Sequence, residues 1–153
     1  MLRSALLTTS ALAALLLAGC GDSGRSSKSD YEQRVRSIYA DIQEAFQKTN
    51  VTSTTLLADR IEAAQGTLRS SADELEEIEP PKQVEEETEE LVEGMREYAD
   101  DLDELHEAAV RGDRAAVEAF TSGVAKNEAV ERMAEAAEEM KFKGYDLGPI
   151  AEE

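Results

Sequence analysis

Aromatic residues, cysteine, proline and histidine are all scarce in this chain of 153 residues. It has no Trp, three Phe, four Tyr, three Pro, one Cys and one His. A single cysteine cannot form an internal disulfide, and so few aromatic residues leave a mainly aliphatic core. Runs of alternating β-branched residues are also missing, which argues against strands. The abundance of Ala, Glu and Leu favours helices.

Positive charge is the next shortage. The chain has 16 Lys and Arg residues against 34 Asp and Glu residues, a formal net charge of −18. A field of that sign repels nucleic acid and anionic lipid headgroups, so neither is expected as a ligand. A surplus of negative charge commonly keeps a small domain in solution, although it also attracts cations or a basic partner.

The amino-terminal 20 residues differ from the rest of the chain. Arg3 supplies one positive charge, and residues 5–17 form an apolar run. That run is shorter than the roughly 20 apolar residues that cross a bilayer, and it has the layout of an export signal. It ends in Leu17-Ala18-Gly19-Cys20, and the next residues are rich in Gly and Ser.

These four residues resemble the lipobox of bacterial lipoproteins in both position and context. The resemblance implies cleavage after Gly19 and attachment of diacylglycerol to Cys20, with palmitate among the acyl chains. Residues 1–19 are then a signal peptide, and residues 20–29 are the lipidated cysteine and a flexible tether. The expected location is the cell membrane, on its extracytoplasmic face, with the lipid bilayer as one partner.

Four amphipathic segments follow, and we expect a helical bundle over 30–144 and a tail over 145–153. Ser29 is the expected cap of the first segment, with Glu32 completing a capping box. The second segment begins near Ser53 and ends before Pro80-Pro81. The third has the most regular pattern in the chain, and its apolar seam is Val84, Thr88, Leu91, Met95, Tyr98, Leu102, Leu105 and Ala109.

The fourth segment is expected to run from Asp113, as its cap, to Gly144, as its stop. Its apolar positions are Val117, Phe120, Val124, Val130, Ala134, Ala137 and Met140. Short connections make such helices antiparallel neighbours, so the sequence predicts an all-α, up-down-up-down four-helix bundle. A three-helix core with a loosely docked first helix is the alternative.

Acidic residues are concentrated between Asp73 and Glu104, where sixteen of them accompany only Lys82 and Arg96. Along the third segment they fall between the seam positions and should face outward. A solvated face is the first interpretation. A weak surface for divalent cations and a docking site for a basic partner are the alternatives, and the candidate partner face is Glu86, Glu89, Glu90, Glu93 and Glu97.

Three smaller motifs have structural explanations. His106 follows Asp103 at the spacing found in di-iron bundles, but those need a second such element, and the chain has no second histidine. Arg111-Gly112-Asp113 matches an adhesion tripeptide, yet it suits a turn between two helices. Asn127 lies near the seam of the fourth segment, where a buried Asn can fix the register of helices.

No set of residues predicts catalysis, a cofactor or a metal site, and we do not expect an enzyme. Ile78-Glu79-Pro80-Pro81 and Lys143-Gly144-Tyr145-Asp146-Leu147 resemble segments of small, uncharacterised Ala/Glu-rich helical lipoproteins of actinobacteria. That resemblance implies no known activity. The expected function is a helical binding or structural module of the cell envelope, with an envelope protein as candidate partner. The alternative is a carrier that holds a small ligand or a metal inside the bundle.

Overall fold

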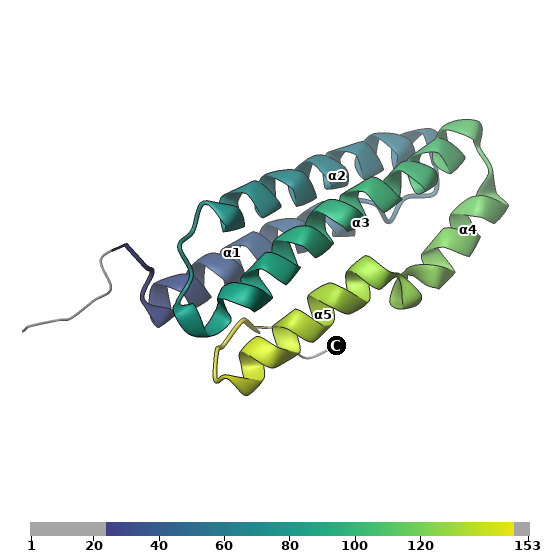
Figure 1. The fold of residues 1–153 in the computed structure, drawn as a ribbon. Helices are drawn as coiled ribbons and strands as arrows, with labels where there is room; N and C mark the ends of the chain where they lie inside the picture. Colours follow the sequence, from purple (N-terminus) through teal and green to yellow (C-terminus); the bar gives the residue numbers. More distant parts are fainter. Residues whose placement is uncertain (1–23, 149–153) are drawn as a thin grey trace, which may run out of the picture.

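The computed structural model describes residues 24–148, and this part of the chain is all-α. The helices form a bundle in which α3 lies between α2 and α5 (Figure 1). No strand occurs within the described range. The elements are α1 (Lys28–Gln47), α2 (Thr54–Glu76), the 3-10 turn η1 (Lys82–Val84), α3 (Glu85–Arg111), α4 (Arg114–Gly123), the 3-10 turn η2 (Val124–Lys126) and α5 (Glu128–Phe142).

The cap of the first helix lies two residues before the predicted one. Ser27, not Ser29, is the N-cap of α1, and its Oγ accepts a hydrogen bond from the Asp30 amide at 3.2 Å. Both serines precede an acidic residue by three positions, so the pattern alone does not separate them. The Ser27 hydroxyl also donates to the Asp30 carboxylate at 2.8 Å. Lys28 and Ser29, assigned to the tether, are therefore helical.

The chain just before α1 is also held against the bundle. The Ser26 amide donates to the carbonyl of Glu79 at 2.8 Å, and the Arg25 guanidinium donates to the carbonyl of Pro80 at 2.8 Å. These contacts tie the start of the described chain to the turn that follows α2. Arg25 and Ser26, which were assigned to the flexible tether, are thus bound to the bundle.

The first helix is part of the core, which argues against a loosely docked α1. Tyr31, Val35 and Ile38 are buried, and Tyr31 is fully enclosed. The Tyr31 hydroxyl lies 2.7 Å from Oγ1 of Thr88 on α3. Burial, more than any other effect, raises the pKa of Tyr31 to about 12. All eight predicted seam residues, Val84 in η1 and seven in α3, are buried as well, so that prediction is confirmed.

The fourth predicted helix is interrupted, which corrects the sequence interpretation. Val124–Lys126 forms a 3-10 turn, and Asn127 adopts extended backbone angles. The Asn127 side chain caps α5 by accepting from the Val130 amide at 3.1 Å, and it donates to Asp101 on α3 at 2.7 Å. Asn127 therefore ends one helix and begins another, and does not set a register within a seam.

The interruption changes which residues of α5 face the core. Ala134 was expected on the apolar face but is exposed. The buried residues of α5 are Ala129, Ala136, Ala137 and Met140. The 3-10 turn advances the chain by a different angle per residue than an α-helix does, so one continuous helical pattern cannot describe both halves.

The described part of the predicted tail belongs to the core. Gly144 has φ 86° and ends α5, as expected, and the Tyr145 amide donates to the carbonyl of Met140 at 3.0 Å. Tyr145 and Leu147 are then buried. The Tyr145 ring meets the Tyr31 ring edge to face, with centroids 6.0 Å apart. The bundle therefore extends at least to Leu147.

Candidate functional site

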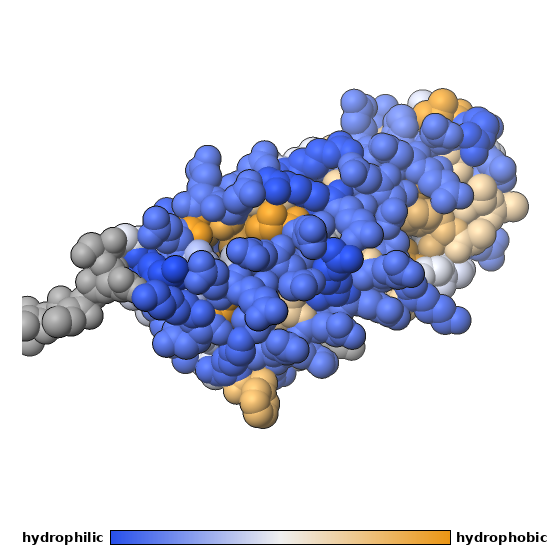
Figure 2. All heavy atoms as spheres, in the orientation of Figure 1, coloured by the Kyte–Doolittle hydropathy of each residue, from blue (hydrophilic) through white to orange (hydrophobic). Residues whose placement is uncertain are grey.

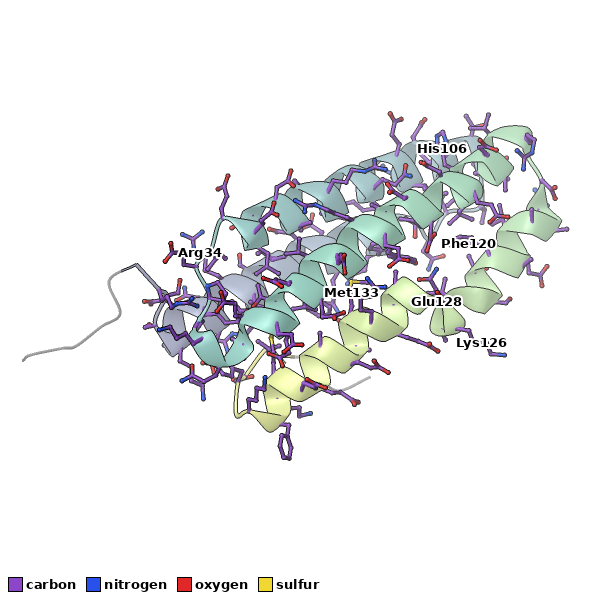
Figure 3. All side chains as sticks on the ribbon, in the orientation of Figure 1. Arg34, His106, Phe120, Lys126, Glu128 and Met133 are labelled. Atoms are coloured by element: carbon purple, nitrogen blue, oxygen red, sulfur yellow. The ribbon has the colours of Figure 1, made fainter. Side chains whose placement is uncertain are left out.

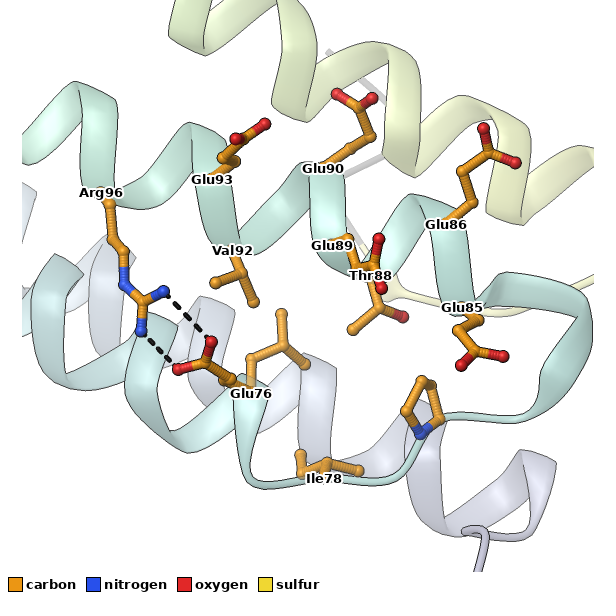
Figure 4. A pocket seen from close by; sticks show the side chains of 12 residues that line it. Glu76, Ile78, Glu85, Glu86, Thr88, Glu89, Glu90, Val92, Glu93 and Arg96 are labelled. Carbon is orange, nitrogen blue, oxygen red and sulfur yellow. Dashed lines mark hydrogen bonds and ion pairs between the residues drawn. The ribbon is translucent and has the colours of Figure 1, made fainter.

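A groove with an apolar floor and an acidic rim runs between the end of α2 and the first half of α3 (Figure 4). Its volume is about 500 Å³. Leu75, Ile78 and Val92 form the floor, and each is buried. In the space-filling view an apolar hollow lies among hydrophilic side chains over α2 and α3 (Figure 2). The rim carries Glu85, Glu86, Glu89, Glu90 and Glu93.

The local sequence explains this arrangement. Pro80-Pro81 follows α2 and prevents its continuation, so the chain turns and α3 begins at Glu85. The first turn of α3 is acidic, with Glu85, Glu86 and Glu87, and carboxylates at a helix N-terminus are favoured by the helix dipole. Further glutamates then recur every three or four residues, which places them along one side of the helix.

The structure divides the five predicted partner-face residues into two groups. Arg132 of α5 reaches Glu90, Glu93 and Glu97 at 3.7, 2.9 and 3.4 Å, so these three carboxylates fasten α5 to α3. Glu86 and Glu89 are exposed and lie outside this cluster. The sequence placed all five on the outside of α3 but gave no sign that one arginine would hold three of them.

A second arginine closes one end of the groove. The Arg96 guanidinium donates to Glu76 at 2.6 Å and to Asp73 at 2.8 Å, so α3 is joined to α2. The hydrogen bond from Arg96 lowers the pKa of the Glu76 carboxyl, and the same pair raises the pKa of Arg96. The floor of the groove thus ends at a fixed ion pair.

Glu87 is a buried carboxylate that sequence reasoning missed. It is only 4% exposed, and its Oε1 accepts a hydrogen bond from the Lys143 ammonium just after α5. Its Oε2 has no hydrogen-bond partner within the described range. Burial acts to raise the pKa of Glu87, but the hydrogen bonds and charge of Lys143 prevail, and the pKa lies below its ordinary value. In the sequence, the one indication that Glu87 could be buried is its place next to Thr88, a seam position.

A cavity at the opposite end of the bundle was also missed. Its volume is about 470 Å³, and side chains of α1, α2, α3 and α4 line it. Phe46 of α1 stacks on Tyr98 of α3 there, with centroids 5.9 Å apart, and Phe120 of α4 is another lining residue (Figure 3). The sequence identified these residues as apolar but gave no sign that they would leave a space.

The smaller motifs do not form a site. His106 is half-buried near the end of α3 (Figure 3), and Asp103 accepts a hydrogen bond from the Gln65 amide at 2.6 Å. Within residues 24–148 no three His, Cys, Asp or Glu side chains gather in a way that could hold a metal ion. Gly112 has φ 68° and Asp113 caps α4, which confirms the turn predicted for Arg111-Gly112-Asp113.

Cys20 and the lipobox residues Leu17, Ala18 and Gly19 lie outside the described residues. Among the helices of the described part, none is long and apolar enough to span a bilayer. No family model matches the chain, and neither a curated protein nor a solved structure matches it.

Proposed function

We propose that this protein is an extracytoplasmic lipoprotein, anchored in the cell membrane through Cys20, whose helical domain binds a basic, amphipathic segment of an envelope protein. The observation that carries the binding proposal is the groove, because it combines an apolar floor with an acidic rim. Leu17-Ala18-Gly19-Cys20 supports the anchor. The proposed role is binding, without catalysis, cofactor or metal.

The groove suits one kind of partner. An apolar side chain of a peptide can be buried against the floor of Leu75, Ile78 and Val92. Such burial contributes roughly 25 cal/mol of binding free energy per Å² of apolar surface. The exposed carboxylates of Glu86 and Glu89 beside it favour Lys or Arg on the same peptide. Opposite charges mainly raise the association rate and exclude wrong partners, whereas the floor supplies affinity.

The groove lies next to the proposed anchor. Arg25, near the start of the described chain, forms an ion pair at 3.1 Å with Glu85 on the rim. The four residues from Cys20 to Gly24 span at most about 14 Å when fully extended. The partner segment is therefore expected close to the membrane surface, where a juxtamembrane stretch of another envelope protein would be.

An up-down-up-down course of the helices forms part of this proposal. Along α2 and α3 the pairs Arg69–Asp100 and Glu76–Arg96 support it, because the later residue of α2 pairs with the earlier residue of α3. Such a course brings the end of α2, the start of α3 and the start of α1 to one end of the bundle. The anchor and the groove then share that end.

Crosslinking in living cells tests the binding proposal. The double variant Glu86→Lys/Glu89→Lys should lose a crosslinked partner that the wild type retains, because two rim charges are reversed while the Arg132 cluster stays intact. The matched control is Glu62→Lys/Glu104→Lys, which reverses two exposed charges outside the groove. Equal capture by both double variants would contradict the docking role of the groove.

The anchor is tested separately. Radiolabelled palmitate should enter the wild type and fail to enter Cys20→Ser, and the variant should leave the membrane fraction. Labelled Cys20→Ser protein would overturn the lipid attachment. Because this outcome does not depend on the groove, failure of the anchor and failure of the docking site can be told apart.

A further inference from the structure

The cavity between the far ends of α1, α2 and α3 and the inner face of α4 is unusual in a chain that is one-third charged. None of its lining residues carries a charge at neutral pH. Most are aliphatic or aromatic, and the few polar ones are Thr49, Asn50 and Thr121. The apolar lining residues are Phe46, Val51, Leu57, Ile61, Ala64, Tyr98, Leu102, Leu105, Val117, Phe120 and Val124.

This cavity is partly open to solvent, and its volume is that of a binding pocket. An apolar cavity of roughly 150 Å³ holds one benzene molecule. At about 470 Å³ this cavity has about three times that volume, and it falls within the range of small-molecule pockets. By that scaling it accommodates roughly 20 non-hydrogen atoms.

The helix α4 covers one side of the cavity and rests on the edge of the core through half-buried side chains. None of its residues is buried, and Val117 and Phe120, which face the cavity, are half-buried. Its start follows Gly112, at φ 68°, and its end passes into η2 and the extended Asn127. The helix therefore covers the cavity with half-buried side chains only, and the cavity stays partly open to solvent.

We propose that this cavity binds an uncharged, largely apolar small molecule of roughly 20 non-hydrogen atoms, such as a single long hydrocarbon chain with a hydroxyl or carbonyl end. The uncharged lining excludes an ionic group inside the cavity, because a buried charge without a partner is costly. The net charge of −18 further disfavours an anionic end. Thr49 and Asn50 are the polar groups available to a hydroxyl or carbonyl.

The proposed ligand is a separate molecule, because the acyl groups on Cys20 are expected to stay in the bilayer. The start of α1 lies beside Glu79, whereas Phe46, which lines the cavity, is near the other end of the same helix. Twenty helical residues at about 1.5 Å each separate these ends by roughly 30 Å. With the anchor in the bilayer, the cavity faces away from the membrane. The inference goes beyond the docking groove and does not depend on it.

Binding of N-phenyl-1-naphthylamine, an uncharged apolar fluorophore, tests the cavity directly. Its fluorescence should rise with the wild-type full-length protein and saturate. Val124→Phe, which fills the cavity, should weaken the probe's affinity at least tenfold. The matched control Ala125→Phe adds the same side chain at the exposed neighbouring position and should stay within twofold of the wild type. Equal affinity in the two variants, or no saturable binding by the wild type, would overturn the proposal.

Competition and mapping sharpen the test. Dodecanol should displace the probe at a concentration at least tenfold lower than dodecanoate, and equal competition would refute an uncharged ligand. Methyl NMR on the wild type avoids any folding defect of the variants. Dodecanol should shift the Leu102 and Val117 methyl signals and leave those of Leu75 and Val92, in the groove, unchanged. The reverse pattern would place apolar ligands in the groove instead.

Discussion

The two halves of the predicted fourth helix, α4 and α5, pack very differently although both are amphipathic and both lie along α3. Four residues of α5 are buried, and none of α4 is. At the α5 crossing, α3 presents Gly94, and a Cβ added there would meet Cγ of Met133 at 2.5 Å and the carbonyl of Ala129 at 3.1 Å. α5 therefore approaches α3 closely because the facing residues are small.

Where α4 crosses α3 the facing residues are larger, and within residues 24–148 no ion pair joins the two helices. Val117 and Phe120 meet Leu102, Leu105 and Tyr98 around an open space. Arg132 of α5, by contrast, reaches three carboxylates of α3. The comparison shows that an apolar stripe does not by itself produce close packing. Small residues at the crossing decide whether a helix closes onto its neighbour or leaves a cavity.

The largest expected effect contrasts the two regions directly. Leu68, in the packed part, is 1% exposed, and Leu68→Ala should lower the free energy of unfolding by about 2–5 kcal/mol. Phe120→Ala should cost far less than the roughly 3–5 kcal/mol usual for a core Phe, because one side of its ring faces the cavity. Urea unfolding of both variants measures the difference. A cost for Phe120→Ala equal to that of Leu68→Ala would show that α4 is packed as tightly as the core.

A pair of glycines provides the next test. Gly94→Ala should be net destabilising, because overpacking costs about 1–3 kcal/mol and better helix propensity returns at most about 1 kcal/mol. Gly66 is an exposed glycine inside α2, and a Cβ there would meet nothing within 4 Å. Gly66→Ala should therefore stabilise the protein by up to about 1 kcal/mol. Thermal unfolding of both variants shows whether each substitution raises or lowers stability. Stabilisation by Gly94→Ala would mean that α3 and α5 do not meet closely.

The sequence predicted the structure correctly where apolar residues keep one helical spacing over a long segment. It failed where a local hydrogen bond breaks the helix and changes that spacing. All eight predicted seam positions are buried, Val84 in η1 and the other seven in α3, because a continuous helix of this length averages out local effects. The break at Asn127 was missed, since one side chain hydrogen-bonding to Val130 and Asp101 outweighs the propensity of the residues around it. That miss led to the misplacement of Ala134.

The candidate site was predicted less completely than the fold. The outward position of Glu86 and Glu89 follows from helical spacing alone. The groove floor, in contrast, joins Leu75 and Ile78 from around the end of α2 to Val92 of α3, and only tertiary packing brings them together. Glu87 was missed for the same reason, because its burial depends on Lys143, 56 residues away.

The smallest expected effect concerns Glu87 and Lys143, which hold the end of α5 against α3. The depressed pKa of Glu87 means that its contribution to stability is present above its unfolded-state pKa of 4.5 and is lost as pH falls through the folded-state value. In Lys143→Met the hydrogen bond and the charge that lower the pKa of Glu87 most are lost, so burial acts against fewer opposing contacts and the pKa of Glu87 should rise relative to the wild type. The variant should be less stable than the wild type at pH 7. The difference should be smaller at about pH 3.5, because that pH lies below the unfolded-state pKa of 4.5 and the contribution of a depressed pKa is lost as pH falls below it.

Urea midpoints at the two pH values test this dependence, with Lys48→Met as the control. Lys48 pairs with Glu44 at 2.7 Å on the surface of α1, as an exposed pair one helical turn apart. Solvent screening leaves such a pair little effect on stability, so Lys48→Met should have a midpoint close to that of the wild type at both pH values. A deficit of Lys143→Met that is equal at both pH values would mean that loss of side-chain packing, and not the charge of Glu87, causes it. α5 would then be held chiefly by its small buried residues, and the contrast with α4 would rest on shape alone.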